Sequence, residues 1–341
     1  MKREINYNLE ALRAMACVMV ICIHVSNYYC RGYGLGEVSN TSYIISVVWN
    51  SISRIAVPIF FMISGALLLE ERIQLRKSFK RVGRTMLTLL LWSGIYYVWN
   101  MIYRDRLYDV EMLLEEPVKK HLWFLYAIIG IYLILPFLQC MVCYMSDEMA
   151  ACFVAMWYGL LTIEYIVSFM KVDIAYSVPL IGNSCYVGYF ILGYILKTRL
   201  GNIPVSVRTC FLGATLALLA IIILTCICTS LERTHVDKLF ENRNVLVAIS
   251  ASLVFCGMQK RQGYSDRVKR ILRFVSKHSF MIYLCHVIFI DIVKLEFAPR
   301  SVPAFFGIPF YTGLVFVTSV LFSMAWCFIK NTFLTEAKFI K

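Results

Sequence analysis

The first long apolar segment of the chain, 9–29, carries an arginine and a histidine on one helical face. Arg13 and His24 are eleven positions apart, and eleven helical steps of about 100° return to the same face roughly 16 Å further along the axis. An imidazole can act as a general base or as a nucleophile, and arginine binds anions. Ionisable groups at such depth are costly and indicate function. The alternative is that Arg13 extends to the interface and His24 packs as a structural residue.

A second basic group precedes the third apolar segment, in Lys80-Arg81-Val82-Gly83-Arg84. Arg81 and Arg84 are helical neighbours, so both guanidinium groups can converge on one anion such as phosphate. The alternative is a basic cluster that anchors the helix on anionic lipid. Glu10 stands in the same i, i+3 relation to Arg13 and is expected to pair with it.

Two further groups lie at or inside apolar segments. His121 and Trp123 begin the fourth segment, where either an aromatic belt or a sugar pocket uses such residues. Ser279, Tyr283 and His286 follow an i, i+4, i+7 pattern and form one polar stripe. This stripe must face the bundle interior and not lipid, either as part of a site or as a structural hydrogen-bond network.

The second segment contains an arginine one turn before a proline, Arg54 and Pro58, followed by Ser64-Gly65. The proline frees a backbone carbonyl, and the small residues permit close approach of another helix. Arg54 is expected to have an anionic or carbonyl partner, for which Glu164 is a candidate.

Transmembrane helices must position these residues. Of the 341 residues, 60% are hydrophobic and 16% are charged, which is less charge than a soluble protein of this size carries. The apolar residues form long runs, so the sequence predicts an all-α, polytopic bundle of about ten transmembrane helices in a single integral-membrane domain, 1–341. The expected spans are 9–29, 44–69, 85–103, 122–143, 149–170, 180–196, 209–229, 244–258, 278–295 and 308–329.

Basic residues concentrate in alternate loops, which predicts the orientation of the bundle. The segments 1–13, 72–84, 197–208, 260–277 and 330–341 hold most of the lysines and arginines, so both termini are expected in the cytoplasm. This bias accounts for most of the net charge of +13, which therefore does not predict nucleic-acid binding. Most of the thirteen cysteines lie inside apolar runs, and neither a metal site nor a disulfide framework is expected.

Together these segments resemble the acyltransferase 3 family of multipass membrane acyltransferases. The resemblance covers about residues 5–330 and rests on the Arg13/His24 and Arg81/Arg84 spacings and on "PIFFMISG", "HLWFLYAIIGIYLILPF" and "SFMIYLCH". The HLWFL form is most similar to the bacterial surface-polysaccharide and enterobacterial common antigen O-acetyltransferases. The chain departs from the family pattern at Glu10, where Asp is more frequent, but the charge is kept.

The resemblance implies transfer of an acetyl or small acyl group from cytosolic acetyl-CoA to a hydroxyl of an extracytoplasmic or lipid-linked glycan, at a bacterial plasma membrane. Acetyl-CoA would be a co-substrate, and no permanently bound cofactor is expected. A multipass transporter or flippase for a glycan or acyl donor is the alternative. The implied site comprises His24 as general base or acyl acceptor, Tyr283 and His286 toward the oxyanion, Arg13, Arg81 and Arg84 for the CoA phosphates, and His121, Trp123 and Arg54 for the acceptor.

Overall fold

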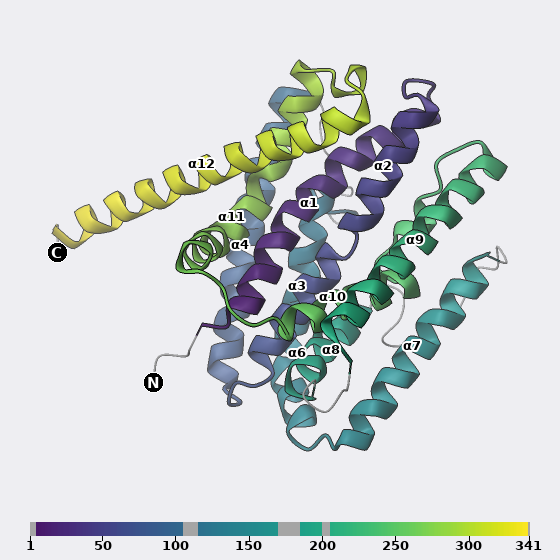
Figure 1. Ribbon diagram of the computed structural model, residues 1–341. Coiled ribbons are helices and arrows are strands. Elements are labelled where there is room, and N and C mark those ends of the chain that lie inside the picture. The colour runs from purple at the N-terminus through teal and green to yellow at the C-terminus, as the bar shows by residue number, and fades with distance from the viewer. Residues whose placement is uncertain (1–4, 105–114, 170–184, 200–204, 340–341) are drawn as a thin grey trace.

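The computed structural model is a bundle of long helices packed side by side (Figure 1), and it describes residues 5–104, 115–169, 185–199 and 205–339. Those residues contain no β-strand. Short 3₁₀ turns, η1 (Lys120–Leu122), η4 (Asp237–Phe240) and η5 (Pro299–Ser301), precede α6, α10 and α12. The helices are α1 (Tyr7–Tyr33), α2 (Asn40–Ser53), α3 (Ala56–Leu68), α4 (Leu75–Arg104), α6 (Trp123–Cys143), α7 (Asp147–Phe169), α8 (Cys185–Arg199), α9 (Val207–Glu232), α10 (Val245–Gln259), α11 (Asp266–Glu296) and α12 (Ala304–Phe339).

Within the described residues, nine helical segments are long and apolar enough to cross a membrane. They coincide with nine of the ten expected spans, which confirms the prediction of a polytopic helical bundle. The remaining span, 180–196, corresponds to α8, which the structure describes over Cys185–Arg199. The first residues of that expected span, 180–184, lie outside the described residues.

The expected span 44–69 consists of two helices, α2 and α3, separated at Arg54 and Ile55. Pro58 explains the break, because its ring would clash with the carbonyl of the residue four positions earlier, Arg54, and it has no N–H to donate. Pro58 is tolerated in the first turn of α3, where the backbone N–H groups have no partner inside the helix. The break leaves Arg54 at the junction of two helices.

Helix α1 lies in the middle of the bundle and packs against α2, α3, α11 and α12, with α7 and α12 at opposite edges (Figure 1). Helices α3 and α8 form an especially close pair. A Cβ atom added at Gly65 would overlap the backbone of Phe190, and one added at Gly193 would overlap the backbone of Met62. These two glycines therefore allow the backbones of α3 and α8 to touch.

A buried ion pair ties the turn before α6 to α11. Lys119 Nζ lies 2.5 Å from Asp291 Oδ2, and the two side chains are 12% and 3% exposed. Lys119 also donates to Asn100 Oδ1 of α4 at 3.0 Å. Because breaking a buried ion pair leaves an uncompensated charge, this arrangement holds three segments in one register.

Candidate active site

A cavity of about 410 Å³ lies between α1, α3, α4, α6 and α11. We call it the Arg–His cavity, because it has arginines and histidines among its lining residues. The polar residues that line it are Arg13, His24, Ser64, Arg81, Arg84, Thr85, His121, Trp123, Ser279, Tyr283 and Tyr132, and the apolar ones are Val20, Val57, Phe60, Phe124, Ile128 and Phe280. Seven of the nine residues of the expected site thus line one cavity.

Arg13 is held at the wall of this cavity by two contacts. Its Nη1 donates to Glu10 Oε1 at 3.0 Å, which confirms the expected pairing, and to Ser276 Oγ of α11 at 2.7 Å. The second contact fixes the guanidinium group between α1 and α11. Arg13 and His24 line the same cavity from the same helix, as the helical spacing predicted.

Arg81 reaches the cavity from α4 and pairs with Glu71, in the loop before that helix, at 2.7 Å. Lys77 contacts the same carboxylate oxygen at 2.7 Å. Burial raises the pKa of Glu71, but hydrogen bonds and positive charge from Lys77 and Arg81 outweigh burial and hold the pKa below its usual value. Arg84 lines the cavity beside them and forms no ion pair with any described residue. One side of the cavity therefore carries a surplus of positive charge.

Three imidazoles gather at the cavity. The ring centroids of His24 and His286 are 5.2 Å apart, and those of His121 and His286 are 5.3 Å apart. His286 is fully buried and His121 is 5% exposed. Among the described residues, no group of three or more His, Cys, Asp or Glu is arranged to hold a metal ion.

The hydrogen bonding of His286 fixes its tautomer when it is neutral. Its Nδ1 lies 2.6 Å from the carbonyl oxygen of Tyr283, and a carbonyl only accepts, so Nδ1 carries the proton. Nε2 then carries a lone pair, and this atom is buried with no hydrogen-bond partner in the described part of the chain. Both ring nitrogens of His121 are also buried and unpartnered. Such groups require an explanation in a native structure.

His24 makes no hydrogen bond to any described residue, and the ionisable groups that act on it are His286, Lys294 and Arg54. An orienting carboxylate on another helix, the usual partner of a catalytic imidazole, is thus not among its neighbours here. The ring of His286 lies beside that of His24, and its unpartnered Nε2 is a hydrogen-bond acceptor.

The hydroxyl of Tyr283 donates to the carbonyl oxygen of His121. This bond fastens η1 to α11 and holds His121 next to His286. It uses the single hydroxyl proton, while the oxygen can still accept. The expected role of Tyr283 toward an oxyanion stays a prediction, and its observed contact is with the segment that carries His121.

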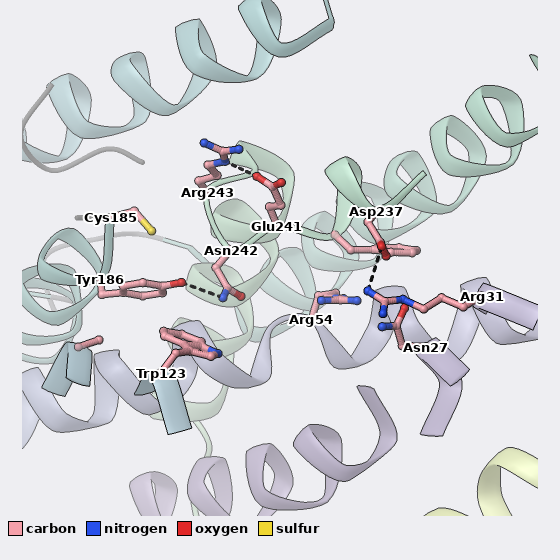
Figure 2. A pocket seen from close by; sticks show the side chains of 12 residues that line it. Asn27, Arg31, Arg54, Trp123, Cys185, Tyr186, Asp237, Glu241, Asn242 and Arg243 are labelled. Carbon is pink, nitrogen blue, oxygen red and sulfur yellow. Dashed lines mark hydrogen bonds and ion pairs between the residues drawn. The ribbon is translucent and has the colours of Figure 1, made fainter. Parts of the chain in front are cut away.

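A second, larger cavity of about 890 Å³ adjoins the first at Trp123, which lines both. We call it the Arg54 cavity, and Figure 2 shows it from close by. Its lining residues are Asn27, Arg31, Arg54, Trp123, Ala127, Cys185, Tyr186, Asp237, Phe240, Glu241, Asn242 and Arg243. Two ion pairs lie among these residues, Arg31 with Asp237 at 3.2 Å and Arg243 with Glu241.

Arg54 lies in this cavity and not in the Arg–His cavity. Its expected partner was wrong, because Glu164 instead pairs with Arg243 at 2.9 Å. Arg54 Nε donates to Asn50 Oδ1 at 2.6 Å, and its guanidinium carbon lies 4.9 Å from the centre of the Phe240 ring. Asn50 is one helical turn before Arg54, so a local contact replaces the distant one.

Sequence reasoning missed Glu71, the cavity walls formed by Phe60 and Tyr132, and the polar residues of η4. Glu71 is one of several charged residues in a short loop, and nothing in its spacing marks it. The pairing of Lys119 with Asp291 was also not foreseen, although an acidic residue inside an apolar segment is a signal that a buried cation lies nearby.

Comparison with known proteins gives one match. A family model described as an acyltransferase domain matches residues 6–328, nearly the whole chain. No curated protein and no solved structure matches the chain.

Proposed function

The chain belongs to the acyltransferase 3 family and is a multipass membrane acyltransferase, and from this premise we propose that it transfers an acetyl or small acyl group from acetyl-CoA to a hydroxyl of an extracytoplasmic or lipid-linked glycan. The observation that carries the proposal is the Arg–His cavity. It brings anion-binding arginines and imidazoles to one cavity. A phosphorylated thioester donor needs both.

In this proposal the CoA phosphates bind at Arg13, Arg81 and Arg84, whose planar guanidinium groups suit phosphate oxygens. The acyl-pantetheine arm lies along the apolar wall that includes Phe60 and Phe124. A volume of about 410 Å³ is within the usual range of small-molecule sites, about 300–1,000 Å³. The basic side of the cavity then faces the cytoplasm, in agreement with the expected orientation.

His24 acts on the thioester in one of two ways. As a general base, it takes the proton of the acceptor hydroxyl, whose oxygen attacks the thioester carbonyl, and the CoA thiolate leaves and is protonated. As a nucleophile, it attacks the carbonyl itself, releases the thiolate and passes the acyl group to the acceptor oxygen, whose proton ends on the released thiolate. In both, the unpartnered Nε2 of His286 is available to accept a hydrogen bond from the His24 ring when the substrates bind, which would select the tautomer of His24 in place of a carboxylate.

The test is transfer of label from ¹⁴C-acetyl-CoA to a glycan acceptor by the full chain in lipid nanodiscs. We expect labelled glycan with the wild-type protein and none with His24→Ala, while the variant keeps the wild-type elution volume and melting temperature. Labelled glycan from His24→Ala at the wild-type rate would overturn the mechanism. Movement of glycan across a sealed bilayer without transfer of label would overturn the enzyme in favour of the transporter.

A further inference from the structure

We propose that the Arg54 cavity binds an anionic saccharide, with Arg54 contacting a carboxylate or phosphate group of that saccharide. The assignment of this saccharide as the acyl acceptor rests on the proposed function. The anion site itself rests on the contacts of the cavity.

The charged side chains that line the cavity are paired, apart from Arg54. Arg31 is paired with Asp237, and Arg243 with Glu241. Arg54 forms no ion pair with a described residue, and Figure 2 shows it without a link to either carboxylate. Arg243 also pairs with Glu164, so three carboxylates serve the other two arginines and none of them contacts the guanidinium group of Arg54.

The guanidinium group of Arg54 is held in place before any ligand binds. Nε is fixed by Asn50 Oδ1 at 2.6 Å, and the plane rests near the Phe240 ring. Neither Nη atom has a hydrogen-bond partner among the described residues. The two Nη groups thus form a fixed fork, which matches the paired oxygens of a carboxylate or phosphate. Little side-chain freedom is lost on binding, which favours affinity.

The rest of the cavity suits a sugar ring. Trp123 and Tyr186 lie side by side, with ring centroids 4.8 Å apart, and offer an apolar platform with a polar edge. Asn27 Oδ1 is buried and has no partner, so it can accept a hydrogen bond from a sugar hydroxyl. Because Trp123 also lines the Arg–His cavity, a ring on this platform lies next to the proposed reaction centre.

The test is equilibrium binding to the full chain in nanodiscs without acetyl-CoA. The probes are uronate trisaccharides of the galacto and gluco series, their carboxyl-reduced neutral counterparts, and the neutral trisaccharides carrying a 1-phosphate. We expect the wild-type protein to bind at least one charged series about tenfold or more tightly than the neutral sugars, as charge-assisted hydrogen bonds imply. The uronate and phosphate arms show which source supplies the anion.

Arg54→Gln is expected to lose this preference and to bind charged and neutral probes alike. Arg54→Lys keeps the positive charge but loses the paired Nη groups, so it should retain only part of the preference for charged probes. Asn27→Asp is nearly isosteric and adds a carboxylate to the cavity, so it should weaken binding of charged probes even if Arg54→Gln fails to fold. The control is Arg208→Gln, an exposed position in the first turn of α9, remote from η4, which should bind as the wild type does.

Equal binding of charged and neutral probes by the wild-type protein, or no binding of any charged probe, would overturn the anion site. So would an unchanged preference in both Arg54→Gln and Asn27→Asp. Acyl transfer to neutral and charged glycans at equal rates, with equal binding, would leave the proposed function standing without this inference. Arg54-dependent binding of charged sugars with no acyl transfer would support the anion site and overturn the proposed function.

Discussion

The buried Nε2 of His286 lacks a partner, and the His286 ring lies 5.2 Å from the ring of His24, centroid to centroid. The two residues come from α11 and α1, which pack against each other at the centre of the bundle. Since the opposite nitrogen of His286 is bound to the Tyr283 carbonyl, the orientation of this ring is set by its own helix. His286 is therefore placed to position His24 and not to donate through Nε2 while neutral.

Substitution of His286 tests this positioning role. His286→Leu should lower kcat by ~10²-fold or more, because His24 loses the partner that selects its tautomer, while KM for acetyl-CoA stays within about twofold. His286→Gln offers an amide oxygen near the position of Nε2 and should restore part of the rate. The measurement is steady-state transfer with a pH profile of kcat. A kcat unchanged in His286→Leu would remove the positioning role.

The arginines of the Arg–His cavity are expected to act through the donor phosphates. Arg81→Ala and Arg84→Ala should each raise KM for acetyl-CoA by about 10–100-fold, the loss expected for a charge-assisted hydrogen bond. With acetyl-pantetheine, which has no nucleotide phosphates, variants and wild type should have similar KM values. Arg208→Ala is the control for loss of one positive charge. Equal losses with both donors would indicate structural damage.

Glu71 occupies Arg81 in the absence of donor, so its carboxylate competes with phosphate. Glu71→Gln should lower KM for acetyl-CoA several-fold, by about the strength of a partly exposed ion pair. The matched control is Glu70→Gln, since the neighbouring Glu70 pairs with Lys197 at 2.6 Å and does not line the cavity.

The pH dependence of that effect follows from the pKa of Glu71. Because the folded-state pKa lies below the usual value, the carboxylate stays ionised down to acid pH, and its contribution to stability is lost only as pH falls through that pKa. The ratio of KM between wild type and Glu71→Gln should therefore be constant between about pH 6 and about pH 8. A ratio that varies across this range would show that another group controls access to Arg81.

The contact between α3 and α8 depends on glycine. Gly65→Ala should lower the melting temperature and transfer activity together, because the added methyl group overlaps the Phe190 backbone and forces the two helices apart. Gly94→Ala, in α4, meets no atom within 4 Å and should be neutral or stabilising by up to about 1 kcal/mol. Thermal unfolding in detergent measures both. Equal melting temperatures would contradict the close packing.

Periodicity within one helix was sufficient to predict what each helix presents to its neighbours. The common face of Arg13 and His24, the Glu10–Arg13 pair and the inward stripe of Tyr283 and His286 all follow from helical geometry. Membrane spans follow from apolar length in the same way.

Contacts between helices could not be predicted from the periodicity within each helix. The approach of His286 to His24 and of Asp291 to Lys119 depends on which helices are adjacent, and a single sequence does not contain that. The assignment of Glu164 to Arg54 failed for the same reason. The observed partner of Arg54 is Asn50, four positions earlier in the chain. That spacing could have been recognised in the sequence.

Helix α1 supplies both Arg13 and His24, and an α-helix neither stretches nor compresses appreciably. The distance between the two side chains is therefore set by the covalent chain at roughly 16 Å, from eleven residues of helical rise. Under the proposed function this segment is a ruler, which measures a donor from its anionic end to its reactive carbonyl. A donor with the same acyl group on a short phosphate, such as acetyl phosphate, would be rejected by length although its chemistry is competent.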